Sequence, residues 1–317
     1  MPSRLGYYLT NLLRLSTPRA LLQQSRTELE QAIDALGREA IEQRLQYICR
    51  FPHRHVLPAD ARVPGTELLS RQRNYAFDLL EHTRALPAGL RYRWRFGDST
   101  EDPGVPTLVK ARKVGELSGN SVLFPLNKVR HFFRVRDPQS FGGKRDSAVW
   151  RGKALQPWRQ QFLRANFHKH HVDIGCIDER PENAPYRKPY AGFAEQLSHK
   201  FIISIEGNDV ATNLKWLLAS NSVCLMPRPT RESWFLEGLL EPGVHYLELQ
   251  PDGANLEELI ERYSRDVRTA ERILEAGQAR VREFFHAARE RVMARAVLLR
   301  YLESTGQMGE SCEPAGG

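Results

Sequence analysis

The chain has 317 residues, enough for one large domain or two ordinary ones, and 41% of them are hydrophobic, as in a globular protein. The formal net charge of +8 favours anionic partners, such as nucleic acid, a membrane surface or phosphorylated ligands, although a merely basic surface explains it equally well. No apolar stretch is long enough to span a bilayer, and arginines interrupt any signal-peptide core. Four unpatterned cysteines suggest a reducing compartment rather than a disulfide framework, so we expect a cytoplasmic protein.

The N-terminal region, residues 4–50, has a helical pattern with a break at Pro18. Its first helix is both apolar and basic, with Leu9, Leu12, Leu13, Arg4 and Arg14. Such a helix is typical of a membrane surface, but more often it packs on the rest of the protein.

The following part predicts a Pro-rich loop, one helix and short strands. In chain order these are a loop over 52–68, a helix over 68–86 and strands over 90–98, 107–113 and 121–127. The turn-rich stretch 136–146 is the predicted linker between two domains.

After this linker the pattern becomes a regular alternation of strands and helices. We expect strands at 147–152, 171–178, 201–205, 223–227 and 244–249, with helices at 156–168 and near 192–200. Such alternation predicts parallel βαβ units in a doubly wound sheet. Residues 255–302 are helical in pattern, and the small polar tail after them is expected to be disordered.

The sequence FIISIEGND places a polar loop directly after an apolar strand, where a doubly wound sheet binds ligands. Gly207 would let the backbone approach a ligand, and Asp209 or Thr212 would cap the following helix. Asn213 and Lys215, near its first turn, suit phosphate oxygens. An ordinary capped strand-to-helix turn explains the same residues about equally well.

The sequence VWRGK marks a second strand end with Arg151, Gly152 and Lys153. An arginine beside a glycine suits a diphosphate or a base edge, and a solvated basic turn is the alternative.

Four motifs in order resemble glycosyltransferase family 90: FGDSTEDPGVPTLVKAR, NKVRHF, VWRGK and the long stretch from KFIISIEGND to HYLEL. The likeness is closest to the bacterial lipopolysaccharide branch, which is related to capsule xylosyltransferases and protein O-glucosyltransferases. It covers residues 91–249.

The resemblance implies an α/β protein with a GT-B-like fold, in which two Rossmann-like domains face across a cleft and helical segments lie at both ends. We expect an acceptor-side domain over 1–145, a nucleotide-sugar-binding domain over 146–285, a C-terminal helix over 286–305 and a disordered tail over 306–317.

The resemblance also implies an inverting transfer of a sugar from a UDP-sugar to a hydroxyl of lipopolysaccharide or a related surface glycan. No cofactor or metal is expected. The donor-binding residues would be Arg112, Arg151, Gly152, Lys153, Glu206, Gly207, Asn208, Asp209, Ala211, Thr212, Asn213 and Lys215. The eukaryotic branch has an arginine at the position of Glu206. Either Arg151, Lys215 or Arg112 therefore neutralises the phosphates, or Glu206 binds the ribose hydroxyls.

The family pattern assigns the catalytic base to Asp98, whereas spacing alone favours Glu101 and Asp102 nearly as well, and a turn role is the alternative. Residues expected to contact the sugar, the acceptor or a phosphate are Lys128, Arg130, His131, Trp234 and Glu237. Two alternatives are equally well supported: Trp234 could be a core residue, and the basic residues Lys128, Arg130 and His131 could form a solvated face.

The histidines of FHKHHVD could suggest zinc, but spacing alone shows no convergent set of ligands, and a polar turn is preferred. The expected partners are a nucleotide-sugar donor and a lipid-linked glycan acceptor, with peripheral contact at the inner face of the cytoplasmic membrane. The competing hypothesis is a non-catalytic basic module that binds an anionic glycan or nucleic acid. No nucleic-acid-binding signature is present, so we expect no nucleic acid.

Overall fold

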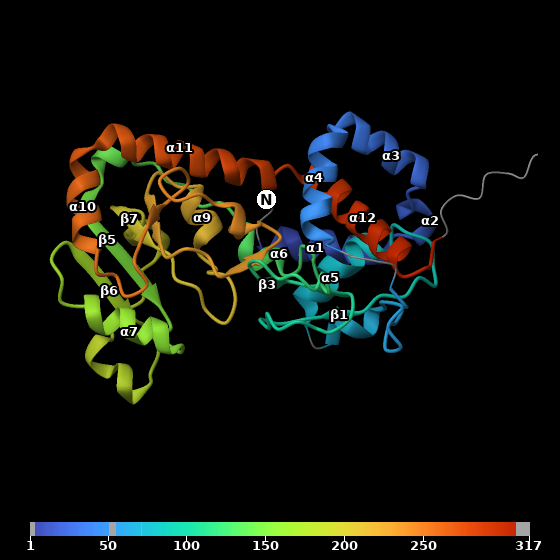
Figure 1. Cartoon of the computed structure of the whole chain (residues 1–317), viewed down its shortest axis with the longest axis horizontal. Coiled ribbons are helices and arrows are strands. Elements are labelled where there is room, and N and C mark those ends of the chain that lie inside the picture. Colours follow the sequence, from blue (N-terminus) through green and yellow to red (C-terminus); the bar gives the residue numbers. More distant parts are fainter. Residues whose placement is uncertain (1–3, 51–54, 71, 309–317) are drawn as a thin grey trace, which may run out of the picture. The chain divides into compact units, whose positions relative to one another are not determined.

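Figure 1 shows the computed structural model of the chain, which describes residues 4–50, 55–70 and 72–308. The chain divides into two compact units. Unit 1 comprises Met1–Val129, Glu232–Phe235 and His286–Gly317, and unit 2 comprises Arg130–Arg231 and Leu236–Phe285. Unit 1 thus consists of three segments of the chain and unit 2 of two, whereas the prediction had one linker between two continuous domains. Residues 309–317 of the expected tail lie outside the described part.

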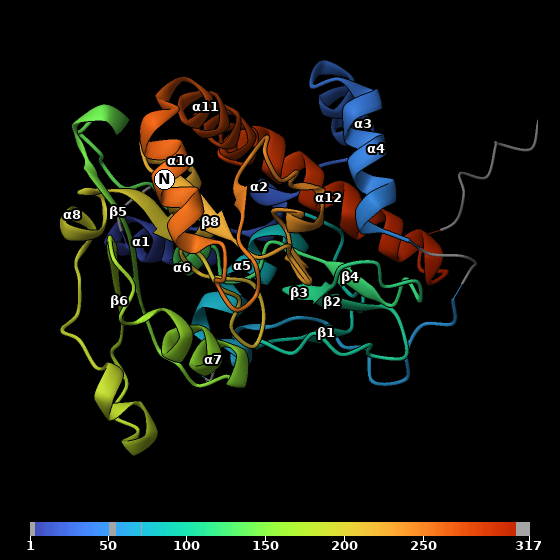
Figure 2. The same cartoon turned by 60° about the vertical axis from the view of Figure 1, so that its left-hand side comes forward.

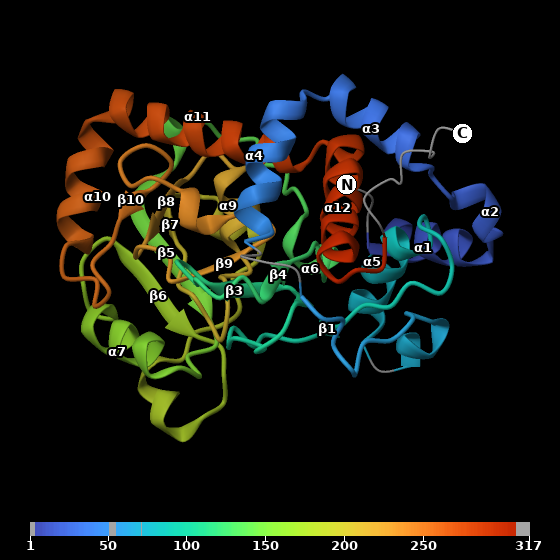
Figure 3. The same ribbon diagram turned by 45° about the vertical axis from the view of Figure 1, so that its right-hand side comes forward.

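The helices of unit 1 come from both ends of the chain: α1 (Arg4–Ser16), α2 (Arg19–Leu22), α3 (Arg26–Ala35), α4 (Arg38–Ile48), α5 (Arg73–Thr83) and α12 (Ala287–Ser304), with a 3₁₀ turn at Thr66–Ser70. The predicted break is confirmed, because Pro18 precedes α2. A reciprocal capping box between Ser25 and Glu28 starts α3. The C-terminal α12 packs against α3, α4 and α5, as Figure 3 shows.

The strands of unit 1 are short. β1 (Trp94–Arg95), β2 (Thr107–Val109) and β4 (Ser121–Leu123) form a parallel sheet in the order β1-β2-β4, seen in Figure 2. The single strand expected over 107–113 is two strands, because the chain breaks at Lys110 between β2 and β3 (Ala111–Lys113). β3 pairs with β9 (Arg231–Ser233).

Unit 2 contains the predicted parallel sheet. Its strands are β5 (Arg145–Gly152), β6 (Val172–Cys176), β7 (His199–Ile203), β8 (Val223–Met226) and β10 (Leu247–Glu248), in the order β10-β8-β7-β5-β6. Every pairing is parallel. The α/β class and the parallel sheet are thus confirmed, whereas the GT-B arrangement remains a prediction.

The helices of unit 2 connect these strands: α7 (Pro157–Asn166), α8 (Phe193–Gln196), α9 (Leu214–Leu218), α10 (Leu256–Arg265) and α11 (Val267–Phe284). A four-residue α6 (Lys128–His131) lies where the chain enters the unit, and 3₁₀ turns occur at Phe141–Gly143, Pro181–Tyr186 and Glu237–Leu239. Figure 1 shows β5, β6 and β7 between α7 and α11.

The core of unit 2 follows the alternation of its strands. Ala148 and Trp150 of β5 share one buried cluster with Phe201 and Ile203 of β7, and residues of α7, α10 and α11 complete it. From β5 the chain winds outward to β6 and then returns past β5 to β7. Ligands of such sheets bind outside the carboxyl ends of the strands. This edge of unit 2 is therefore the place to look for a site.

The described residues also bear on the expected absence of a membrane-spanning segment and of disulfide bonds. None of their helices combines the length and apolarity needed to cross a bilayer. Cys49, Cys176 and Cys224 are buried and form no disulfide, while the fourth cysteine of the sequence lies outside the described part.

Candidate functional site

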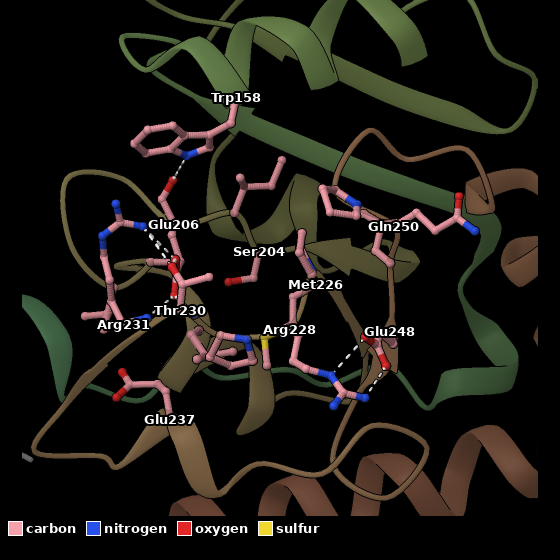
Figure 4. A pocket seen from close by; sticks show the side chains of 18 of the residues that line it. Trp158, Ser204, Glu206, Met226, Arg228, Thr230, Arg231, Glu237, Glu248 and Gln250 are labelled. Atoms are coloured by element: carbon pink, nitrogen blue, oxygen red, sulfur yellow. Dashed lines mark hydrogen bonds and ion pairs between the residues drawn. The ribbon is translucent and has the colours of Figure 1, made fainter. Parts of the chain in front are cut away.

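A cavity of about 750 Å³ opens at the carboxyl edge of the parallel sheet of unit 2, shown in Figure 4. It is formed by the segments that follow β7, β8 and β10, together with Trp158 from α7 and Glu237. The volume lies within the range of cavities that enclose small organic ligands. The predicted ligand edge of the sheet therefore does carry a pocket.

The lining is mainly apolar, with charged side chains among the apolar ones. The apolar part consists of Ile205, Val210, Ala211, Leu214, Met226, Pro227, Pro229, Leu249 and Pro251, and the charged part of Glu206, Arg228, Arg231, Glu237 and Glu248. An apolar cavity with a few placed charges suits a ligand that has both a ring and an ionic group.

Glu206 fixes the segment that follows β8. Its Oε1 accepts from the backbone N–H groups of Thr230 at 2.9 Å and Arg231 at 3.0 Å. Its Oε2 accepts from the Thr230 hydroxyl at 2.5 Å and the Arg231 guanidinium at 2.9 Å. A carboxylate has about four lone-pair sites, and these bonds occupy that capacity. The geometry argues against the alternative in which Glu206 binds ribose hydroxyls.

Helix α7 holds the backbone of the loop after β7. The Glu206 carbonyl accepts from Trp158 Nε1 and Arg159 Nε, both at 2.9 Å, and the Ile205 carbonyl accepts from Arg159 Nη2 at 2.5 Å. Burial lowers the pKa of the Arg159 guanidinium to about 10, so Arg159 remains protonated at neutral pH. The Arg231 guanidinium lies over the Trp158 ring, 5.1 Å from its centroid. The rim of the pocket is thus built from interlocked charged and aromatic groups.

Arg228 occupies another part of the rim. Its guanidinium donates to both oxygens of Glu248 at 3.1 Å, and its side chain is 70% exposed. An exposed ion pair of this kind contributes little to stability, so an anionic ligand can compete for the arginine.

Lys215 does not face the pocket as expected. It forms an ion pair with Glu237, and the two side chains are 0% and 2% exposed. Its ammonium also lies 5.9 Å from the centroid of the Phe132 ring. A lysine held in this way argues against the predicted contact with a diphosphate. Glu237 lines the pocket instead, and its role at the sugar remains a prediction.

Arg151, expected to contact phosphate, is bound to groups of its own unit. Its guanidinium makes a bidentate pair with the Asp173 carboxylate at 2.8 Å and donates to the carbonyls of Asp173 and Pro189. Arg151 therefore ties β5 to β6. Gly152 is required by packing, because a Cβ there would lie 2.9 Å from the Trp150 ring. Lys153 is exposed just after β5.

The loop after β7 differs in detail from the expectation. α9 begins only after Asn213, so Asp209 and Thr212 do not cap it. The Asn213 side chain bonds to Ser204 Oγ and to a carbonyl of β7 rather than to the helix. The predicted cap by Asp209 or Thr212 is therefore wrong, whereas the phosphate contact of this loop remains a prediction.

The other predicted residues of this loop differ in their exposure and in their contacts. Ala211 lines the pocket, and exposed Asn208 accepts from Gln156 at 3.0 Å. Asp209 is buried, and its carbonyl accepts from the Gly207 N–H. A Cβ at Gly207 would meet Arg159 at 3.5 Å, an ordinary contact, so sterics do not demand glycine there.

Two candidates in unit 1 are buried. The Arg112 guanidinium donates to Glu232 at 2.8 Å and to the carbonyl oxygens of Tyr47, Ile48 and Ser121. Trp234 is a core residue whose Nε1 donates to Glu290 and whose ring lies under Arg44. These contacts argue against the expected roles of Arg112 in donor binding and of Trp234 at the sugar.

Asp98, the predicted base, follows β1 in unit 1. Its carboxylate forms an ion pair with buried Lys110 and accepts from the Tyr75 hydroxyl at 3.4 Å, and the side chain remains 35% exposed. The rival Asp102 accepts from the Gly104 N–H at 2.8 Å, and this bond holds the pKa of Asp102 below its usual range. Asp102 is thus a turn residue, whereas Glu101 is exposed.

The basic motif around α6 is only partly accessible. The Lys128 ammonium is paired with Glu81, and its backbone N–H donates to Asp78 at 2.8 Å. His131 is buried, whereas Arg130 is exposed. Of these three predicted contacts, Arg130 alone presents an exposed side chain.

Residues 4–50, 55–70 and 72–308 contain no group of three or more His, Cys, Asp or Glu side chains that could hold a metal ion. His170 and His171 border a separate cavity of about 460 Å³, with Asp146, Glu257, Glu261 and Arg265. Because Asp146 lies at the start of β5 and His171 precedes β6, this cavity is at the amino ends of the strands.

The pocket residues that were not predicted include Trp158, Arg228 and Arg231. Arg159, which holds the loop after β7 by its carbonyls, was not predicted either. The sequence VCLMPRPTRES carried a signal for two of them, because the basic stretch PRPTR directly follows an apolar strand. Applying the carboxyl-edge rule to that strand would have found Arg228 and Arg231.

Comparisons with known proteins agree with the expected resemblance. The model of glycosyl transferase family 90 matches residues 127–300, which include all of unit 2. An O-glucosyltransferase LpsA from Dichelobacter nodosus is 39% identical over 294 residues, covering 91% of this chain and 92% of that protein. The predicted resemblance to the family is confirmed.

Proposed function

The chain belongs to glycosyl transferase family 90, and we propose that it transfers a sugar, with inversion, from a UDP-sugar to a hydroxyl of lipopolysaccharide or a related surface glycan. One observation on the structure supports this proposal in addition to family membership. The pocket of unit 2 lies at the carboxyl edge of the parallel sheet, inside the region that matches the family, and combines apolar lining with two rim arginines.

The pocket suggests how a UDP-sugar would be held. Its apolar walls accommodate the uracil ring, and Arg228 and Arg231 offer guanidinium groups to the diphosphate. Glu237, fixed by Lys215, offers carboxylate oxygen to hydroxyl groups of the sugar. Arginine supplies the counter-charge in this proposal, so it requires neither metal nor cofactor.

The transfer needs a base on the acceptor side, and we assign this role to Asp98 of unit 1. Its carboxylate takes the proton of the acceptor hydroxyl as the hydroxyl oxygen bonds to C1 of the sugar. The bond from C1 to the diphosphate oxygen breaks, and UDP leaves with that electron pair, stabilised by the arginines. In this proposal units 1 and 2 correspond to the two domains of a GT-B-like fold.

The relative from Dichelobacter nodosus is named an O-glucosyltransferase, so we propose glucose as the transferred sugar and UDP-glucose as the donor. Because nucleotide sugars are made in the cytoplasm, we propose that the reaction takes place on the cytoplasmic side.

UDP release tests this function. We expect release from UDP-glucose, and less from UDP-galactose or UDP-xylose, when a lipid-linked glycan acceptor is present. A thermal-shift screen of the three donors gives an independent readout, because a ligand that binds the folded state raises its apparent stability. Binding of the glycan without UDP release from any donor would instead support a non-catalytic module.

The rim arginines give a more specific prediction. Arg228→Ala and Arg231→Ala are each expected to weaken UDP binding about tenfold or more, because a hydrogen bond to a charged group contributes about 1.5–3 kcal/mol. The measurement is calorimetric titration with UDP. Arg265→Ala is the matched control, since Arg265 is an exposed arginine paired with Glu261 outside the pocket. Unchanged UDP affinity in both rim variants would show that the diphosphate binds elsewhere.

A further inference from the structure

Helix α1 is attached to unit 1 by its polar face. The Tyr7 hydroxyl donates to Asp78 Oδ1 at 2.8 Å, and the Arg14 guanidinium pairs with Glu81 at 3.2 Å. Asn11 is buried on the same face, one turn from each of these residues. Asp78 and Glu81 belong to α5, beside which α1 lies in Figure 3.

The opposite face of α1 is apolar and exposed. Leu5, Leu9, Leu12 and Leu13 are 68%, 52%, 54% and 69% exposed. Their spacing of four, seven and eight residues places them in one stripe. An amphipathic helix of a globular protein normally turns such a stripe toward the core, with its polar face to water. In α1 the arrangement is reversed, so the stripe is available to a partner outside the chain.

The charge around this stripe indicates which partner it fits. From Arg4 to Gln24 the sequence contains Arg4, Arg14 and Arg19 and no acidic residue. Leu21 of the following α2 is also exposed. Arg14 pairs with Glu81 and Arg19 donates to the carbonyls of Thr83 and Leu86, so Arg4 is the exposed arginine of this segment. Exposed leucines in a segment with a basic and no acidic residue are typical of helices that lie in the interface of an anionic membrane.

A second copy of the chain fits this surface less well. A stable protein interface takes about 800 Å² from each partner, which is more than four partly exposed leucines provide. A bilayer needs no complementary protein surface, because its acyl chains adapt to the stripe.

We propose that α1 binds the surface of an anionic phospholipid bilayer, with its leucine stripe at the boundary of the acyl chains and the exposed Arg4 near the headgroups. The inference rests on the geometry of α1 and not on the proposed function. Binding to a bilayer would bring the protein to the surface in which a lipid-linked acceptor lies.

The test is co-sedimentation with vesicles of phosphatidylcholine alone, or of phosphatidylcholine and phosphatidylglycerol in equal parts, across a salt series. The full chain, with its net charge of +8, is expected to bind the anionic vesicles more tightly than the neutral ones, and to lose affinity as salt screens this charge. Leu9→Gln/Leu12→Gln/Leu13→Gln is expected to lose about tenfold to a hundredfold of the affinity, because three leucines no longer enter the acyl region.

The control is Leu117→Gln, which changes an exposed leucine between β3 and β4 of unit 1 and should bind vesicles like the wild type. UDP titration of the triple variant should match the wild type, which separates vesicle binding from folding and from the donor pocket. Equal binding to both vesicle types, no binding to either, or full binding by the triple variant would overturn the proposal. A dimer that the triple mutation dissociates would assign the stripe to a second copy.

Discussion

Asp98→Asn is expected to reduce turnover about 10²–10⁴-fold, the usual effect of losing a positioned general base. An amide has nearly the shape of a carboxylate but cannot take a proton from the acceptor hydroxyl. Lys110 and Tyr75 hold the Asp98 side chain in place, and the proposed donor pocket is lined by residues of unit 2. UDP affinity should therefore stay at the wild-type value, which shows that the variant is folded.

Two neighbouring carboxyl groups serve as matched controls for this prediction. Glu101→Gln changes an exposed side chain and should retain near wild-type turnover. Asp102→Asn alters a turn that Asp102 caps through the Gly104 N–H, so its effect should be mainly on stability. Wild-type turnover in Asp98→Asn would refute the assignment, and a large loss in Glu101→Gln would transfer the role to Glu101.

Lys215→Met is expected to lower the free energy of unfolding by about 3–5 kcal/mol. The change removes one member of a buried ion pair and leaves the buried Glu237 carboxylate without the charge of Lys215. Methionine has a similar length, so lost packing contributes little. Urea unfolding of both proteins measures the difference.

The double variant Lys215→Met/Glu237→Gln distinguishes charge from packing. It leaves no unpaired charge and should recover a substantial part of the lost stability. Arg265→Ala, which breaks an exposed pair, should change stability by less than about 1 kcal/mol. A loss in Lys215→Met no larger than in this control would contradict a buried, structurally required pair.

The order of strands and helices in unit 2 was predictable because it depends on local patterns. Apolar runs bounded by polar loops indicated β5, β6 and β7, and the alternation with helices indicated parallel pairing. The carboxyl-edge rule then located the loop after β7, part of which lines the pocket. The place where α9 begins was not predictable, because the Asn213 side chain bonds to β7 instead of capping the helix.

The partners of charged side chains were beyond prediction because they lie far away in the sequence. Arg112 meets Glu232 across 120 residues, and Lys215 meets Glu237 across 22. A basic residue near a strand end has the same sequence pattern whether it binds phosphate or an internal carboxylate. The orientation of α1 is a similar case, since the spacing of its leucines predicts a stripe but not the side to which the stripe faces.

The central claim is that the pocket of unit 2 binds the nucleotide sugar, and photoaffinity labelling with 5-azido-UDP-glucose tests it most directly. After irradiation and digestion, labelled peptides are mapped, with and without excess UDP. The structure predicts UDP-protected labels within residues 204–214, 226–231 and 248–255, which line the pocket. Protected labels confined to the cavity at His170, His171 and Glu257, or to unit 1, would contradict it.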